Sequence, residues 1–245
     1  MNGFLKIKSF SVPEAHQAVA VDLRSFYAIS NRTIARYAKE TTESKPKAIV
    51  RWTAPAESPV KHLNSGIVLN GRLYCANSNW PKKPLRNTVE VFEAATLQHL
   101  ERKEFPETEG AINWIDRHRG GWWIVFAFYG KADVRKTRLV RYNDDWQNTG
   151  IWTFPESVIQ RFLPNSNSGG AFGPQGRLFV TGHDHAELYV LTVGQKPGEL
   201  IHEATIKAPI AGQGIAWDHG NPPTLYGIVR RRHEVVRMTI SPTVN

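Results

Sequence analysis

One five-residue pattern recurs five times along the chain, and it limits the possible folds more than any other feature. Each copy alternates apolar residues with others and ends on a large apolar or aromatic side chain. The copies are residues 33–37, 88–92, 138–142, 187–191 and 234–238, and their last residues are 55, 50, 49 and 47 positions apart. Alternation of this kind is typical of a half-buried β-strand. A nearly regular interval indicates a repeat protein, in which every unit contributes to one architecture.

Two more segments precede each copy of the pattern. The nearer one is rich in β-branched and aromatic residues and lies at 25–29, 72–76, 122–126, 177–181 and 224–228. The other is made of small or apolar residues and lies at 17–21, 64–68, 111–115, 168–172 and 213–217. Turn residues such as Asn70-Gly71 and Gly120-Gly121 separate the two segments, as expected for adjacent antiparallel strands. Small residues suit an innermost strand that is crowded against a central axis.

Outer strands are expected at residues 48–53, 97–104, 150–154 and 200–206, so four units have four strands each. The fifth unit has no outer strand of its own, and the alternating residues 5–10 can supply it. The sequence therefore predicts an all-β fold, a five-bladed β-propeller with four-stranded antiparallel blades, as a single domain over residues 1–245. The N-terminal strand would close the last blade. Two alternatives stay open: six blades, by division of the long third or fourth unit, and a β-sandwich.

Composition narrows the class of protein further. The 245 residues contain no apolar run near the ~20 residues that span a bilayer. The single cysteine, Cys75, excludes an internal disulfide framework and a multi-cysteine metal site. A net charge of +9 favours anionic partners, but the cations are dispersed, so nucleic-acid binding is not expected. No export signal is visible near Met1, which predicts the cytoplasm and leaves a periplasmic location after processing open.

A propeller would gather two sets of loops around one mouth of its channel: those that lead into the innermost strands and those that leave the second strands. These loops carry amide, imidazole and hydroxyl side chains, which suit a polar ligand or a cation. Asn and Ser as plain turn formers are the alternative explanation. The expected ligand-binding residues are His16, Gln17, Asn64, Trp80, Asn113, Tyr129, Asn167, Ser168, Gln213 and Arg230.

Chemistry at this mouth would depend mainly on histidine, because imidazole titrates near neutral pH. His62 and His183 are the expected acid–base residues, with Asp184 able to orient His183. The fork of Arg230 suits a carboxylate or phosphate, although residues 230–233 can also be a solvated charge run.

The segment 182–185 also suggests a metal site. In an extended strand, His183 and His185 would point to one side, and His16 or His62 could add a third ligand for zinc, calcium or manganese.

The strand cores, such as residues 71–74 and 176–179, resemble those of the five- and six-bladed propeller families of bacteria. The resemblance implies sugar binding, lactonase, cyclase or glycan-cleaving activity, and similar bacterial propellers are sometimes labelled cycloisomerases or lactonases. Plant-type glutamine cyclotransferases are similar in blade count, but their catalytic residues find no match here. Because fold alone does not fix function, two hypotheses follow. One is an enzyme of the hydrolase, lyase or isomerase type that acts on a small polar or anionic substrate; the other is a non-catalytic module that binds a glycan or a protein.

Overall fold

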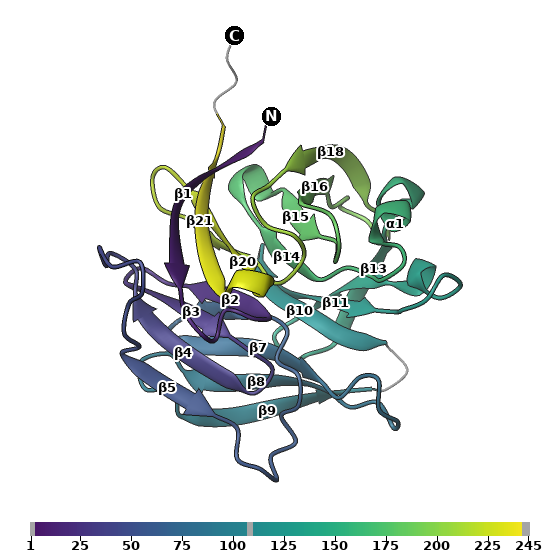
Figure 1. Cartoon of the computed structure of the whole chain (residues 1–245). Coiled ribbons are helices and arrows are strands. Elements are labelled where there is room, and N and C mark those ends of the chain that lie inside the picture. Colours follow the sequence, from purple (N-terminus) through teal and green to yellow (C-terminus); the bar gives the residue numbers. More distant parts are fainter. Residues whose placement is uncertain (1–2, 107–109, 242–245) are drawn as a thin grey trace.

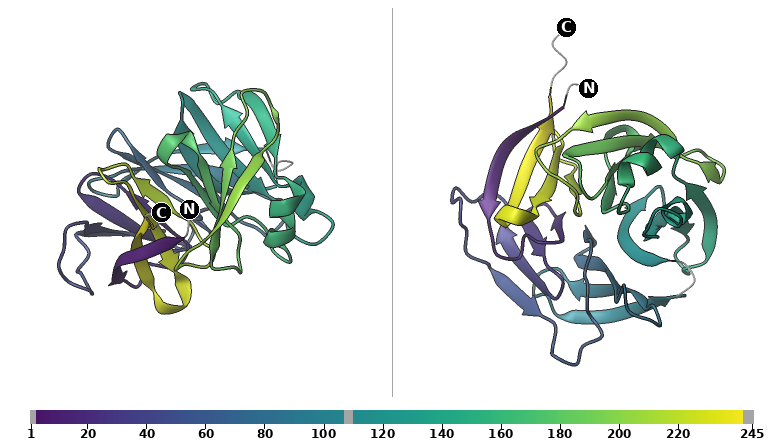
Figure 2. Two further views of the ribbon diagram at one scale, coloured as in Figure 1. Left: turned by 90° about the horizontal axis from the view of Figure 1, so that it is seen from above. Right: turned by 45° about the vertical axis from the view of Figure 1, so that its right-hand side comes forward.

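Five small sheets follow one another around a ring in the computed structural model, which describes residues 3–106 and 110–241 (Figure 1; Figure 2). The chain is therefore a five-bladed β-propeller, as the repeat predicts. Neither six blades nor a two-sheet sandwich is formed by these residues. In the same part of the chain, no helix combines the length and the apolar character needed to cross a membrane.

Each blade contains four antiparallel strands, which follow the order of the sequence pattern. The innermost strands are β2 (Ala18–Val21), β6 (Ile67–Leu69), β10 (Ala111–His118), β14 (Gly169–Phe172) and β19 (Ala216–Asp218). The second strands are β3 (Ser25–Ile29), β7 (Arg72–Ser78), β11 (Gly121–Ala127), β15 (Leu178–Thr181) and β20 (Thr224–Val229). The third strands are β4 (Thr33–Ala38), β8 (Asn87–Glu93), β12 (Arg138–Tyr142), β16 (Glu187–Thr192) and β21 (Glu234–Ile240). The outer strands are β5 (Val50–Thr53), β9 (His99–Phe105), β13 (Asn148–Thr153), β18 (Ile201–Lys207) and β1 (Phe4–Ser11).

The ring closes by pairing the two ends of the chain, as predicted. β1 runs antiparallel to β21 from the pair Phe4 and Ile240 to the pair Ser11 and Glu234. Figure 1 shows β1 and β21 side by side. Phe10 of β1 is fully buried and packs on Phe26 of the first blade, with ring centroids 4.8 Å apart. The closing strand therefore also joins the last blade to the first.

The innermost strands lie so close together that side chains are excluded at some positions. A Cβ atom on Gly169 would lie 2.4 Å from the carbonyl oxygen of Gln213, and one on Gly214 would lie 2.5 Å from Cβ of Ala18. Both contacts are far shorter than van der Waals distance. The small residues that the sequence places in this strand are thus required by the narrow centre of the ring.

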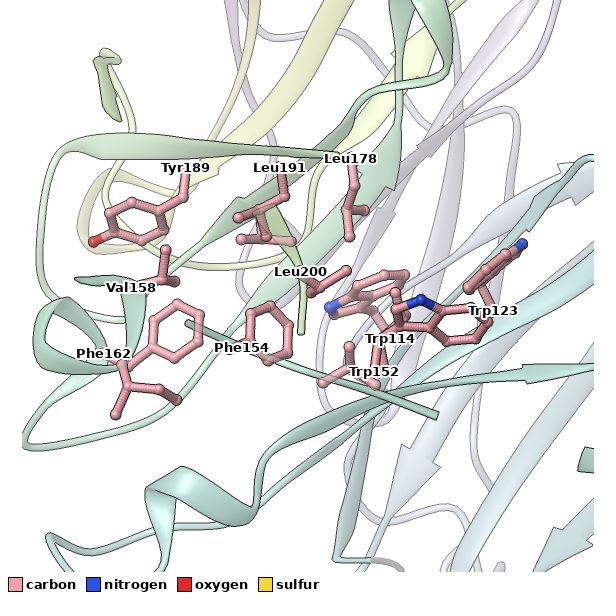
Figure 3. Packing of buried hydrophobic residues seen from close by; sticks show 14 of the residues in the cluster. Trp114, Trp123, Trp152, Phe154, Val158, Phe162, Leu178, Tyr189, Leu191 and Leu200 are labelled. Carbon is pink, nitrogen blue, oxygen red and sulfur yellow. The ribbon is translucent and has the colours of Figure 1, made fainter. Parts of the chain in front are cut away.

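The buried apolar side chains of the described residues form five hydrophobic clusters. The cluster between the third and fourth blades is rich in aromatic side chains, including Trp114, Trp123 and Trp152 (Figure 3). Tryptophans in the strand patterns therefore serve packing between blades. Burial of such large side chains supplies the main driving force for fixing one blade against the next.

Two elements depart from the sequence prediction. The helix α1 (Glu156–Phe162) connects β13 to β14 and buries Val158, Ile159 and Phe162 against the aromatic cluster (Figure 3). A fifth, two-residue strand, β17 (Gly198–Glu199), pairs parallel to β13. Both are too short for a distinct periodic signal in the sequence.

Candidate functional site

Loops from all five blades enclose a cavity of about 190 Å³ at one mouth of the channel, here called the mouth cavity. It is smaller than the roughly 300–1,000 Å³ of sites for drug-sized ligands. In the described part of the chain, none of its lining residues is an aspartate or glutamate. The lining residues are Gln17, His62, Asn64, Ser78, Trp80, Asn113, Tyr129, Asn165, Ser166, Ser168, His183, Gln213 and Arg230.

Most side chains proposed from the sequence therefore come together, although they are spread over more than two hundred positions. Ten of the thirteen predicted site residues line the mouth cavity. Three do not: His16, Asn167 and His185.

His183 forms an imidazole–carboxylate pair with its neighbour Asp184. Nδ1 of His183 lies 2.7 Å from Oδ1 of Asp184, and Nδ2 of Asn165 donates to Oδ2 of Asp184 at 2.9 Å. Burial raises the pKa of Asp184, but hydrogen bonds from His183 and Asn165 outweigh it, so the net pKa is lowered and the carboxylate stays ionised. An ionised Asp184 favours the tautomer with the proton on Nδ1 of His183. Nε2 of His183 is then the basic nitrogen available to a ligand.

His62 is more buried than His183. Burial lowers the pKa of His62, and the nearby charge of Arg230 lowers it further, against the effect of a hydrogen bond with Asn64. His62 is therefore a neutral imidazole at neutral pH. The loop before it is fixed by Asn77, whose Oδ1 accepts hydrogen bonds from the backbone nitrogens of Lys61 and His62, both at 3.0 Å.

Arg230 is the one permanently charged side chain that lines the mouth cavity in the described residues. Its Nε donates to Nε2 of His16 at 3.2 Å, which leaves both terminal nitrogens of the guanidinium for other partners. Burial lowers the pKa of His16, and the charge of Arg230 adds to the effect, so His16 is neutral and able to accept this bond. The predicted ligand-binding residue His16 therefore positions Arg230 and lies outside the mouth cavity.

An aromatic pair forms another part of the wall. The rings of Trp80 and Tyr129 stack with centroids 4.1 Å apart, and Trp80 remains 43% exposed. Burial raises the pKa of Tyr129 to about 12, so its hydroxyl keeps its proton and can donate to a ligand. The pair offers a flat apolar face beside a hydroxyl group, an arrangement that suits a sugar ring.

The amides are held by contacts within one blade or between neighbouring blades. Nε2 of Gln17 donates to Oδ1 of Asn31 at 2.6 Å, and Nδ2 of Asn64 donates to the carbonyl of Ile112 at 3.2 Å. Gln213 has a positive φ of 69°, which is uncommon for a residue other than glycine. Its carbonyl accepts a hydrogen bond from Thr181 at 2.9 Å, so the strained backbone is fixed from outside.

Asn167 has a structural role, contrary to the prediction that it binds ligand. It is 1% exposed, and its Oδ1 accepts a hydrogen bond from Nε1 of Trp114 at 2.6 Å. Its Nδ2 donates to the carbonyls of Gly169 and Thr181 at 3.0 and 2.8 Å, and its own carbonyl accepts a bond from Asn113. The side chain therefore has no free group for a ligand.

The strand geometry assumed for the metal site is also corrected. β15 ends at Thr181, and residues 182–186 form a loop, so His183 and His185 do not alternate along one extended strand. His185 lines neither the mouth cavity nor the neighbouring one. Over residues 3–106 and 110–241, no three His, Cys, Asp or Glu side chains gather in a group that could hold a metal ion.

Asn165 and Ser166 line the cavity but were not among the predicted site residues. They belong to the polar run 165–168, which leads from α1 into β14. The run itself is the signal that could have revealed them. The sequence does not show which of four consecutive polar residues point inward, because their loop follows a helix that was not predicted.

No protein-family model matches the sequence, and a search of curated proteins finds no match. Solved structures do share its fold. A luciferin-regenerating enzyme, itself a propeller, is similar with a TM-score of 0.52 and 12% identity over 97% of this chain and 95% of the other. Similarity is weaker for a protein of unknown function from Bacteroides caccae, with a TM-score of 0.47 and 12% identity over 80% of this chain and 62% of the other. The WD40 propeller domain of Doa1 gives a TM-score of 0.47 and 8% identity over 99% of both chains. At such identities these likenesses concern the fold alone.

Proposed function

We propose that the protein is an enzyme that carries out acid–base chemistry on a small hydroxylated anion bound in the mouth cavity. The observation that carries the proposal is the pair of His183 and Asp184 beside a cavity whose permanent charge is Arg230. Asp184 holds the imidazole in the tautomer with a free Nε2, and Arg230 attracts the anionic group of the substrate. The surrounding amides and hydroxyls bind the substrate's hydroxyl groups.

Opening of a lactone illustrates the roles. Nε2 of His183 removes a proton from a water molecule as its oxygen bonds to the lactone carbonyl carbon. The ring carbon–oxygen bond then breaks, and the imidazolium returns the proton to the alkoxide that leaves. Neutral His62 and the Tyr129 hydroxyl can donate hydrogen bonds to the oxygen that gains negative charge. Cyclisation and elimination need the same proton transfer and belong to the same proposal.

The test compares two histidines that lie two positions apart, His183 and His185. His183→Gln is expected to lower kcat by roughly 10²–10⁴-fold on a panel of lactones of sugar diacids, which keep one free carboxylate, because the general base is lost. His185→Gln is the matched control. His183 and His185 both adjoin Asp184, but His185 lies outside the mouth cavity, so the His185→Gln variant should retain activity. Unchanged turnover in His183→Gln contradicts the proposal. Metal analysis of wild type and of both variants tests the predicted divalent cation. Metal that is bound to wild type and absent from both variants would support the predicted metal site.

A second function, glycan binding without catalysis, is favoured by the exposed stacked face of Trp80. It predicts that neutral sugars stabilise the protein in thermal melts to the same extent in wild type and His183→Gln. It also predicts no turnover of any lactone. The two functions are thus separated by the same pair of proteins.

A further inference from the structure

A larger groove adjoins the mouth cavity and enters no step of the proposed chemistry. It has a volume of about 690 Å³ and lies between the loops of the fourth and fifth blades, here called the side groove. His183, Gln213 and Arg230 line both spaces. The two cavities therefore meet at the proposed base and the proposed anion-binding residue.

One wall of the side groove is apolar, in contrast to the mouth cavity. Pro209 and Val229 are partly exposed there, Ala211 is exposed, and the buried Ala208 and Ile210 lie behind them. Such a surface gains free energy by covering an apolar ligand group, at roughly 0.8 kcal/mol for each fully buried methylene. The other lining residues, apart from Ala186, are polar: His16, His183, Gln213, Arg230, Arg231, Arg232 and His233.

The rim of the same groove is cationic. Arg230, Arg231 and Arg232 form a short turn of 3-10 helix between β20 and β21, and no acidic residue of the described chain lines the groove. Arg232 is paired with Glu234 at 3.1 Å, whereas Arg231 has no ion pair or hydrogen bond within the described residues. The positive potential over the groove is thus only partly neutralised, which favours an anion.

Close backbone packing holds one side of the groove. Gly212, at a φ of 66°, lies where a Cβ atom would approach the carbonyl oxygen of His183 to 2.5 Å. The loop at 208–213 is therefore packed directly against the loop that carries His183. A preformed site loses less entropy when a ligand binds.

We infer that the substrate is an amphipathic organic anion that occupies both spaces. Its hydroxylated, reacting end lies in the mouth cavity, its anionic group binds Arg230 at the junction, and its alkyl or aryl body lies in the side groove. The inference rests on the proposed function for the reacting end. It adds an apolar body to the substrate class, which the mouth cavity alone does not require.

A series of 2-hydroxy acids tests the apolar part directly. The 2-hydroxybutanoate, 2-hydroxyhexanoate and 2-hydroxyoctanoate anions share one polar end and differ only in chain length. Calorimetry on the full-length protein is expected to show affinity rising by roughly two- to fourfold for each added methylene. A dissociation constant that stays the same along the series overturns the inference.

Two matched variants locate the effect. Ala211 is exposed and lines the side groove, so Ala211→Glu places a carboxylate where the chain should lie and is expected to flatten the series. Ala56 is exposed in the connection between β5 and β6 and lines neither space, so Ala56→Glu should leave the rise with chain length intact. Melting temperatures equal to wild type show that both variants fold. An undiminished rise in Ala211→Glu also overturns the inference.

Failure of this inference is distinguishable from failure of the proposed function. Binding is measured by calorimetry on both wild type and His183→Gln. The affinity therefore does not depend on turnover. A flat series together with a catalytic loss in His183→Gln overturns the amphipathic substrate and keeps the enzyme. A rising series with no turnover of any lactone supports the ligand class and contradicts the enzymatic role.

Discussion

The two ends of the channel are built by the same strands but differ in chemistry. The mouth cavity is lined by amides, imidazoles, hydroxyls and Arg230, whereas the cavity at the other end, of about 220 Å³, is lined mainly by apolar residues at the far ends of the innermost strands. There the chain reverses in tight hairpins such as Asn70-Gly71, where both residues have positive φ angles, of 49° and 74°. Turns of two residues offer few side chains to enclose a ligand. Most of the polar side chains that line the channel therefore lie at the end with the longer loops.

The far end nevertheless contains one buried acid. Asp116, in β10, is 8% exposed, and its two carboxyl oxygens accept bonds from the backbone nitrogens of Phe172 at 2.6 Å and Arg117 at 2.7 Å. Burial raises the pKa of Asp116 to about 7 in spite of these two donors. The carboxyl bridges the third and fourth blades, which gives it a role in stability and none in the proposed reaction.

The largest effect expected at the far end is therefore on stability. Because the folded pKa of Asp116 lies above its unfolded value of 3.8, the protonated form is favoured by folding. Its contribution to the free energy of unfolding is complete below about pH 4 and is lost as the pH rises through about 7. The unfolding free energy of wild type minus that of Asp116→Asn should fall by roughly 2–4 kcal/mol over this window, since one pKa unit corresponds to about 1.4 kcal/mol.

Urea unfolding of both proteins at a series of pH values measures this difference. The comparison with a variant removes the contribution of the histidines with lowered pKa, which changes in the opposite direction. A difference that is constant with pH contradicts the burial of a titrating carboxyl at this end. Turnover by Asp116→Asn should remain close to wild type, and a large loss would break the separation between the two ends.

The next effect concerns two arginines at opposite mouths. Arg230→Gln is expected to weaken binding of 2-hydroxyhexanoate by roughly 10- to 100-fold, because a hydrogen bond to a charged group is worth about 1.5–3 kcal/mol. Arg117 lines the other cavity and pairs with Asp144 at 2.5 Å, so Arg117→Gln should leave the affinity unchanged. Calorimetry at one fixed salt concentration gives both values. Equal losses in the two variants would mean that net charge attracts the anion, with no specific site at Arg230.

The fold was predictable because its determinants are local and repeated. Alternating segments, hairpin turns and small inner residues recur in every unit, and the missing fifth outer strand identifies the role of residues 5–10. The helix α1 was not predictable in the same way. Its seven residues are stabilised by burial of Phe162 against the aromatic cluster, a contact that depends on the assembled ring.

The site was predictable at the level of loops and less so at the level of side chains. Topology alone places Gln17, His62 and Gln213 near one another, because each precedes an innermost strand. Whether a given amide side chain is available to a ligand depends on the residues that it contacts in the neighbouring blade. Nε1 of Trp114 donates a hydrogen bond to Oδ1 of Asn167, which makes that oxygen unavailable to a ligand. Trp114 lies 53 positions earlier, and no sequence pattern indicates that the two residues meet.

The smallest expected effect distinguishes two stacked tryptophans. Trp80 stacks on Tyr129 at the mouth cavity, whereas Trp146 stacks on Trp122 at a distance of 5.2 Å and lines neither end of the channel. Trp80→Ala should weaken sugar-acid binding by roughly two- to tenfold, since a favourable aromatic contact is worth about 0.5–1.5 kcal/mol. Trp146→Ala removes an equal ring without touching the ligand and should not change the affinity. If the two variants bind alike, the apolar face of Trp80 lies outside the bound ligand, and the selectivity of this end comes from its amides, imidazoles and Arg230 alone.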